Sequence, residues 1–222
     1  MSRLFDDAAS QYLAVATTPV TAAPFTMACW ARTNDDTIDQ TCFSINDVDT
    51  ANNQWMLRFR GDSVGDPINF SCKAGGTAAS AVTTTGFTAN TWAHVCGVEA
   101  SATDRRVFIN GGSKGTNATS RTPSGIDNVA IGRNGDSTPD GYFSGDIAAA
   151  AIWNVALADA DVALLALGVS PFLVHPESLV FYPPLIGRYN PEIDIRGGYA
   201  MTVTGAVASP HPRMFYPSQG VS

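Results

Sequence analysis

Charged residues are scarce in this sequence, and positive charge is the scarcer kind. Only 15% of the 222 residues are charged, and 20 acidic side chains outnumber 13 basic ones, which gives a formal net charge of -7. An average globular domain contains about 25% charged residues. Nucleic-acid phosphates bind basic surfaces, so we expect no nucleic-acid partner. Much of the polar surface must come from Thr, Ser, Asn, Gln and Gly, a composition that suits an extracellular or assembled β-protein.

Long apolar runs are also missing. No segment has the roughly 20 consecutive apolar residues that a membrane-spanning helix needs. The N-terminus, Met1 to Asp7, has no apolar stretch of the length found in a signal peptide. We therefore expect a protein without a membrane partner that is not secreted through a signal peptide.

The sequence lacks the signatures of common catalytic and metal centres. It has no Gly-x-Ser-x-Gly nucleophile motif and no phosphate-binding glycine loop with its lysine. Its three histidines are scattered, and we expect His94 to be a packed strand residue rather than a base or a ligand. The four cysteines are Cys29, Cys42, Cys72 and Cys96, and none of them has Cys-x-x-Cys spacing. We therefore expect four reduced, buried thiols and no zinc site.

What the sequence does contain is a series of short β-type runs, each ended by a turn-forming residue. Between residues 54 and 60, alternation predicts that Trp55, Leu57 and Phe59 share one strand face. Many such runs separated by Gly, Asn and Asp are typical of an all-β sandwich.

Two further local predictions follow from the same patterns. A period of two places four apolar residues on one face of a late strand, namely Ile147, Ala149, Ala151 and Trp153. One short helix is predicted near 159–167, because acidic residues favour its first turn and Gly168 supplies a left-handed stop.

Five motifs in a fixed order resemble the laminin G-like, concanavalin A-like jelly-roll family of lectins and glucanases. The resemblance covers about residues 5 to 165 and implies an antiparallel β-sandwich. It says little about function, because this fold carries lectins, hydrolases, adhesion domains and virion proteins. The motifs are Phe25 to Arg32 with its Trp30, Trp92-Ala93-His94-Val95, Asn110-Gly111, Ile131-Gly132, and Phe143 to Ile147 running into Trp153-Asn154.

The C-terminal part carries a second resemblance. Residues His175 to Tyr182, with Ile186-Gly187-Arg188 after them, resemble an extension on laminin G-like proteins encoded by bacteriophages and prophages. We therefore expect a jelly-roll domain over residues 1–170 and a C-terminal extension over 171–222. The extension is expected to complete part of the sandwich and to form a proline-rich docking arm. The partners implied are other virion subunits or further copies of this chain.

A candidate ligand site lies in the acidic loop from Gly135 to Gly141. Several laminin G-like domains bind calcium, so the resemblance implies a possible calcium ion at Asp136 and Asp140, whose carboxylates are suitable hard ligands. Tyr142 follows the loop, and we name it as a third ligand-binding candidate because an exposed ring can stack on a sugar. For the neighbouring Phe143 a core position is favoured. The alternative is a solvated acidic loop without metal, and no other cofactor is expected.

A stretch near the C-terminus nearly reproduces the Glu-Ile-Asp-Ile-Glu strand of laminarinase-type β-glucanases. Retaining glycosidases need two carboxyl groups about 5–5.5 Å apart. In Glu192 to Arg196, an arginine stands where the second glutamate belongs. We predict no catalytic residues and no enzyme activity, and we expect these carboxylates to pair with Arg188 or Arg196.

Together these features predict a non-enzymatic structural or binding protein. The first hypothesis is a phage virion component, either a head decoration or a tail-associated subunit, that presents a lectin-like domain. Such a subunit is assembled in the host cytoplasm and is located in the virion. The alternative is a carbohydrate-binding module that recognises a cell-surface glycan, with or without calcium.

Overall fold

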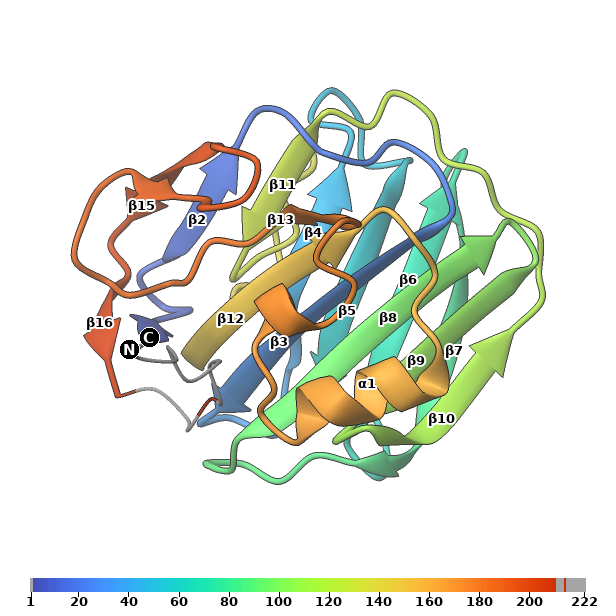
Figure 1. Ribbon diagram of the computed structural model, residues 1–222, viewed down its shortest axis with the longest axis horizontal. Coiled ribbons are helices and arrows are strands. Elements are labelled where there is room, and N and C mark those ends of the chain that lie inside the picture. The colour runs from blue at the N-terminus through green and yellow to red at the C-terminus, as the bar shows by residue number, and fades with distance from the viewer. Residues whose placement is uncertain (1, 211–213, 215–222) are drawn as a thin grey trace, which may run out of the picture.

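The computed structural model describes residues 2–210 and 214, and its two antiparallel sheets form a sandwich (Figure 1). The predicted all-β, jelly-roll fold is confirmed. A central core of aromatic and branched side chains fills the space between the sheets, with Phe25, Phe43, Phe70 and Phe143 among its members. Removing this apolar surface from water holds the two layers together.

The first sheet has eight strands. Their order is β10-β9-β8-β3-β12-β1-β16, and β13 pairs with β12 beside this path. The bounds are β1 Ser2–Phe5, β3 Phe25–Thr33, β8 Ala93–Ser101, β9 Asp104–Ile109, β10 Gly112–Asn117, β12 Gly145–Trp153, β13 Leu179–Phe181 and β16 Val207–Ser209.

The second sheet also has eight strands, in the order β14-β15-β2-β11-β4-β5-β6-β7. The bounds are β2 Tyr12–Val15, β4 Asp39–Asn46, β5 Gln54–Arg60, β6 Pro67–Ala74, β7 Thr77–Gly86, β11 Asn128–Ile131, β14 Glu192–Ile193 and β15 Ala200–Thr204.

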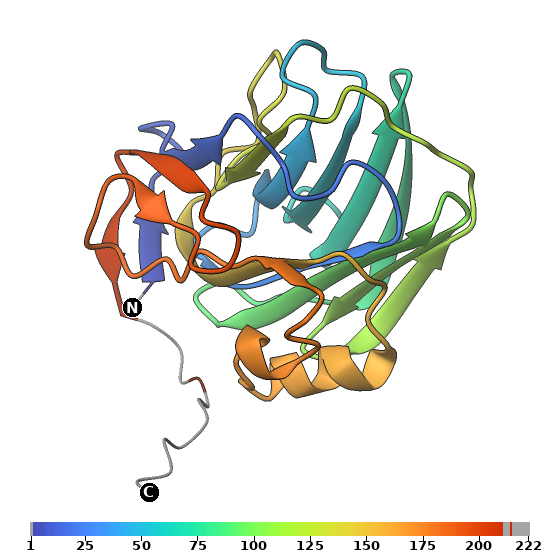
Figure 2. The same ribbon diagram turned by 45° about the horizontal axis from the view of Figure 1, so that its top comes forward.

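The α-helix α1 (Asp159–Ala166) lies against the outer face of the first sheet (Figure 2). Its buried residues Val162 and Leu165 join a second apolar cluster with Trp153 on that face. Gly168, with φ of +87°, follows the last turn, so the predicted helix and its stop are confirmed. A 3-10 turn, η1 (Pro171–Leu173), comes next. Within the described ranges, no helix has the length and apolar character needed to cross a membrane.

The prediction that Ile147, Ala149, Ala151 and Trp153 share one face of a strand is wrong for Ile147, because β12 contains a bulge. The register with β3 shifts between Ala148 and Ala151, and Ala149 has φ of +49°. A bulge adds one residue and reverses which side the following side chains face. Ile147 therefore faces the central core, whereas Ala149, Ala151 and Trp153 lie in the outer cluster.

All four cysteines are free and buried, as predicted. The Sγ atoms of Cys29 and Cys42 lie 3.7 Å apart between the two sheets. Burial raises the pKa of the Cys42 thiol well above its usual value and that of Cys72 to about 12. These thiols stay protonated and unreactive at neutral pH.

The C-terminal segment adds strands to both sheets. β13 pairs with β12, β15 with β2, and β16 with β1, all antiparallel. The proposed docking arm falls mostly on residues 211–213 and 215–222, which lie outside the described residues. The division of the chain near residue 170 stays a prediction.

Candidate functional site

The outer face of the second sheet is polar where β5 and β6 run side by side. In β5, Trp55, Leu57 and Phe59 point into the central core, as predicted from their alternation. The residues that alternate with them, which include Gln54 and Arg58, therefore face outward.

β6 continues this face. Its outward side chains include Ser71 and Lys73, and the pairing of Gln54 with Lys73 aligns the two strands. The alternation that fills the core thus also produces a continuous polar wall.

A loop after β11 forms the opposite wall. Asn134 and Asp140 form an isolated antiparallel bridge, which closes the loop. The side-chain amide nitrogen of Asn134 donates to Asp136 at 2.8 Å and to Asp140 at 2.9 Å. The orientation of this amide is set by Asn46, whose amide nitrogen donates to the Asn134 oxygen at 2.7 Å. These bonds hold the loop carboxylates beside β4 and β5.

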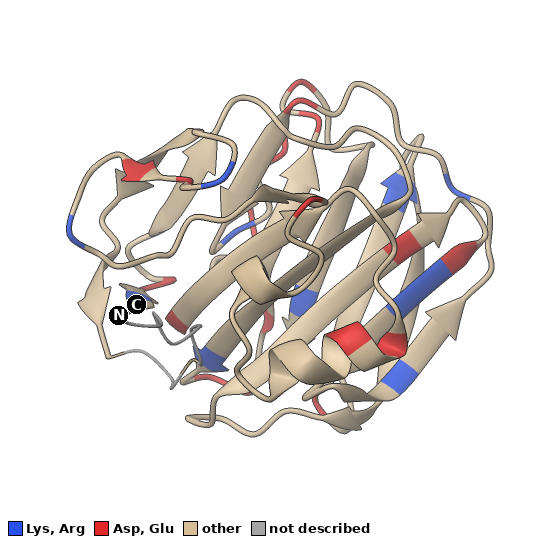
Figure 3. Cartoon of the chain, in the orientation of Figure 1, with Lys and Arg blue, Asp and Glu red and all other residues tan. Residues whose placement is uncertain are grey.

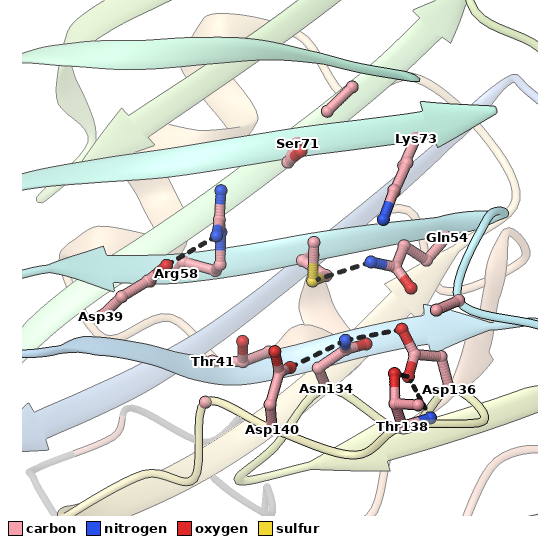
Figure 4. A pocket seen from close by; sticks show the side chains of 14 residues that line it. Asp39, Thr41, Gln54, Arg58, Ser71, Lys73, Asn134, Asp136, Thr138 and Asp140 are labelled. Atoms are coloured by element: carbon pink, nitrogen blue, oxygen red, sulfur yellow. Dashed lines mark hydrogen bonds and ion pairs between the residues drawn. The ribbon is translucent and has the colours of Figure 1, made fainter. Parts of the chain in front are cut away.

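A cavity of about 360 Å³ lies between these two walls (Figure 4). Asp39 and Thr41 from β4 line one end, and Lys73 and Ala78 from β6 and β7 line the other. The described lining contains one thioether, Met56, and no aromatic ring. Polar groups therefore dominate what this cavity offers to a ligand.

Several polar atoms of the cavity are buried without a hydrogen-bond partner. They are Asp39 Oδ1, Gln54 Oε1, Arg58 Nε and Ser71 Oγ. A buried polar atom without a partner costs roughly 1–3 kcal/mol, so such atoms are few in native proteins. Four of them at one cavity mark a place where hydrogen bonds remain to be made.

The ion pair between Asp39 and Arg58 sets the charge at one end of the cavity. The guanidinium Nη1 donates to the Asp39 carboxylate at 2.7 Å. Burial raises the pKa of Asp39, and the nearby Arg58 and Arg60 oppose that effect. Burial lowers the pKa of Arg58, while Asp39 opposes it. Each partner thus offsets part of the desolvation of the other.

The structure places the three predicted ligand residues differently. Asp136 and Asp140 both line the cavity. Tyr142 is half-buried and not part of the lining, and its ring lies 6.5 Å from that of Tyr12. Phe143 is a core residue, as favoured.

Sequence reasoning missed the strand residues of the cavity, chiefly Gln54, Arg58, Ser71 and Lys73. The alternation in β5 indicated which side chains face away from Trp55. It gave no signal that this outer face would line a cavity.

Three carboxylates gather at a different place, between the ends of β4 and β11. Asp47, Asp49 and Asp127 each offer an oxygen, and these atoms lie within 4.8 Å of one another. Hard oxygen ligands of this kind suit calcium. The spacing of these residues in the sequence does not reveal the group, because only the pairing of β4 with β11 brings Asp127 to the other two. Calcium at Asp136 and Asp140 stays a prediction.

The glucanase-like stretch has a structural role. Glu192 forms a buried ion pair with Arg3 at 2.6 Å, so the expected pairing with Arg188 or Arg196 is wrong. Asp194 accepts backbone N–H groups from Arg196 at 2.9 Å and Gly197 at 2.7 Å. β14 is added beside β15 at the edge of the sheet, and this places Glu192 over the N-terminal strand.

His94 is packed within the fold. It is buried on β8, and its ring centroid lies 5.5 Å from that of Trp30. Burial lowers the pKa of His94 to about 3. The ring is therefore neutral at physiological pH, and the prediction of a packed strand residue is confirmed.

Charges elsewhere are spread thinly. Figure 3 shows acidic and basic residues scattered over both sheets, with no run of Lys and Arg along any element that is drawn in colour. Most described arginines are tied to carboxylates, as in the Arg32–Asp146 pair at 2.6 Å.

Comparisons with known proteins agree on the fold. Residues 7–163 match the sequence model of the concanavalin A-like lectin/glucanases superfamily. No curated protein matches the sequence.

Among solved structures, three similar ones share the sandwich at low identity. A putative carbohydrate-binding protein from Bacteroides ovatus has a TM-score of 0.66 and 20% identity, over 94% of this chain and 59% of that one. The CBM40 of the Ruminococcus gnavus IT-sialidase has a TM-score of 0.61 and 15% identity, over 75% and 97%. A heptameric SAP-like pentraxin from Limulus polyphemus has a TM-score of 0.59 and 16% identity, over 74% and 81%.

Proposed function

Because the chain belongs to the concanavalin A-like lectin/glucanase superfamily, we propose that it is a carbohydrate-binding protein whose binding site is the cavity on the outer face of the second sheet. The observation that carries this proposal is the set of four buried polar atoms without partners at that cavity. They comprise acceptor oxygens on Asp39 and Gln54, a donor nitrogen on Arg58, and the Ser71 hydroxyl, which can both donate and accept. Each sugar hydroxyl both donates and accepts a hydrogen bond, so vicinal hydroxyls match such a set.

Two of the similar structures are described in terms of carbohydrate binding. The Bacteroides ovatus protein is described as a putative carbohydrate-binding protein, and the IT-sialidase module of Ruminococcus gnavus was solved bound to α2,3-sialyllactose. At 15–20% identity these proteins argue for the fold alone. The cavity of this chain supplies the reason to extend the binding role to it.

A glycan array with the purified protein tests the proposal, both with calcium and with a chelator. We expect binding to at least one glycan, and Ser71→Ala should weaken it about fivefold to tenfold through the loss of one hydrogen bond. Ser80→Ala is the matched control, because Ser80 lies opposite Ser71 on β7 and does not line the cavity. An array without any binding, or equal effects of the two variants, would refute a glycan site here.

The calcium-assisted form of this proposal rests on the loop carboxylates of Asp136 and Asp140. If calcium takes part, glycan binding falls on chelation and Asp140→Asn reproduces that fall. Binding that is indifferent to chelation makes the site metal-free. Asp49→Asn is the control for the separate group at Asp47 and Asp127, which lies outside the cavity lining.

The role is proposed to be binding without catalysis. Both Asp136 oxygens accept hydrogen bonds from its own loop, from Asn134 and from the backbone N–H of Thr138, and Asp39 is paired with Arg58. Release of reducing sugar from a glycan that the array identifies would overturn this part.

A second proposal places this binding protein in a phage-like particle. It rests on the resemblance of the C-terminal segment to phage extensions and on exposed apolar side chains in that segment. Tyr189 is 68% exposed, and Ile195 is 52% exposed. Single exposed apolar residues are ordinary, but several in one segment suit a docking surface.

Native mass measurement tests the particle proposal. Removal of all residues beyond Pro171 would also delete β13, β15 and β16, so the variant is Tyr189→Ser with Ile195→Ser. We expect an oligomer that this variant dissociates, and Val64→Ser, at an exposed loop residue elsewhere, serves as control. The proposal would be contradicted if the wild-type protein and both variants were all monomeric and purified particles did not contain the protein.

A further inference from the structure

One cation in the cavity has no carboxylate partner. The chain has two lysines, Lys73 and Lys114. Lys114 pairs with Asp159 at 2.9 Å. Among the described residues, no carboxylate forms an ion pair with Lys73, although it is half-buried at the cavity wall. In Figure 4 its side chain points from β6 toward Gln54.

Two further donors lie along the same wall of the cavity as Lys73. Ser71 lies two residues earlier on the same face of β6, and its hydroxyl has no partner. On the neighbouring strand β5, Arg58 Nε also has no hydrogen-bond partner. The Nη1 atom of the same guanidinium donates to Asp39. The wall formed by β5 and β6 thus presents three donor groups in a row. An anionic oxygen accepts such donors more strongly than a hydroxyl does.

No described carboxylate of the cavity forms an ion pair with Lys73. Asp39 is paired with Arg58, and Asp136 and Asp140, which keep their negative charges, are held on the opposite wall by hydrogen bonds from Asn134. The net charge of -7 acts at longer range, and it is largely screened beyond about 8 Å at physiological ionic strength. With no aromatic ring in the described lining, affinity must come from hydrogen bonds and charge rather than stacking.

We infer that the cavity binds an acidic saccharide whose single negatively charged group is held by Lys73, with Ser71 and Arg58 as further donors. This inference rests on the proposed glycan-binding function and adds the class of sugar. One unpaired cation matches one negative charge, which a sugar carboxylate or a sulfate monoester carries. The hydroxyls of the same sugar face the acceptor oxygens of Asp39 and Gln54.

Matched glycans that differ in one charged group provide the test. One set is lactose, 3'-sialyllactose and 3'-sulfolactose, and the other is oligogalacturonate and its methyl ester. We expect the acidic member of a bound set to bind at least tenfold more tightly than its neutral counterpart, as a charge-assisted hydrogen bond warrants. The comparison of the sialylated with the sulfated lactose distinguishes the two sources of charge. The preference should weaken as salt rises.

Two lysine variants assign the effect. Lys73→Met should abolish the preference for the acidic sugar, whereas Lys114→Met, which changes the net charge equally, should keep it. Equal binding of acidic and neutral members, or a preference that survives Lys73→Met, overturns the inference. If Ser71→Ala still weakens that binding, the glycan site itself stands. If no glycan binds in a manner that Ser71→Ala weakens, the proposed function fails along with the inference.

Discussion

The two sheets of the sandwich use their outer faces in opposite ways. The outer face of the first sheet is apolar, and Phe108 and Trp153 lie buried there beneath α1 and the segment that follows it. The outer face of the second sheet is polar, and the described residues place no helix over it (Figure 2). The same strand alternation builds both faces, so the difference lies in the side chains and in what covers them. One face contributes stability, and the other carries the proposed ligand site.

The largest expected effect comes from removing a ring under the helix. Trp153 is fully buried, and its indole N–H donates to the Val174 carbonyl at 2.7 Å. Trp153→Ala should lower the free energy of unfolding by about 3–5 kcal/mol, measured by urea denaturation. Trp92 is half-buried beside Arg32, so Trp92→Ala should cost much less. Equal losses would mean that the covered face adds little stability.

A smaller effect is expected where the helix approaches the β9–β10 turn. Gly111 has φ of +74°, and a Cβ there would lie 2.9 Å from Ala163 Cα of α1. Gly111→Ala should destabilise the fold by roughly 2–4 kcal/mol through left-handed strain and displacement of the helix. Gly112→Ala is the control, because a Cβ at Gly112 meets nothing within 4 Å. The midpoints of thermal unfolding of the two variants should differ clearly. Equal midpoints would show that α1 is loosely held.

The pH dependence of stability should report on the same covered face. Burial lowers the pKa of His94 to about 3, whereas an unfolded histidine titrates near 6.5. The unfolded state therefore binds more protons between these values, and the stability contributed by neutral His94 is lost as pH falls from about 6.5 towards 3. At pH 5 the loss is about 2 kcal/mol relative to pH 7.

One histidine variant isolates this contribution. His94→Leu should flatten the pH dependence of urea unfolding between pH 7 and pH 5. A wild-type slope that persists in His94→Leu would show that other groups govern acid sensitivity.

The smallest expected effect is at the open face. Ser71 Oγ is buried without a partner, so Ser71→Ala should change the free energy of unfolding by less than about 0.5 kcal/mol or raise it slightly. On the covered sheet, Thr26 Oγ1 donates to the Val155 carbonyl at 2.8 Å and accepts from the Leu157 N–H at 2.9 Å. Thr26→Val should therefore cost roughly 1–3 kcal/mol. A reversed order would indicate that Ser71 serves the fold rather than a ligand.

The sequence predicted the fold well because its motifs are local. The Trp-x-His-Val strand, the Asn110-Gly111 turn and the alternation of β5 each depend on residues a few positions apart, and all are present in the structure. The short helix was predictable for the same reason.

Features that depend on distant residues could not be predicted in this way. The bulge in β12 depends on how β3 pairs with it, and the partner of Glu192 is Arg3, at the other end of the chain. The cavity required knowledge of which sheet α1 covers. Asp136 and Asp140 were found from the family resemblance and the acidic composition of their loop, while Arg58 and Ser71 looked like ordinary outward strand residues.

The interleaving of the chain ends has a consequence for the order of folding. β1 lies between β12 and β16, and β2 lies between β11 and β15, so each N-terminal strand is flanked by strands made much later. Contacts that span most of the chain raise the contact order and slow folding. During synthesis, both N-terminal strands wait with unsatisfied edges until residues 200–209 emerge. In that interval the nascent chain is most prone to aggregate, and chaperones can bind its unpaired strands.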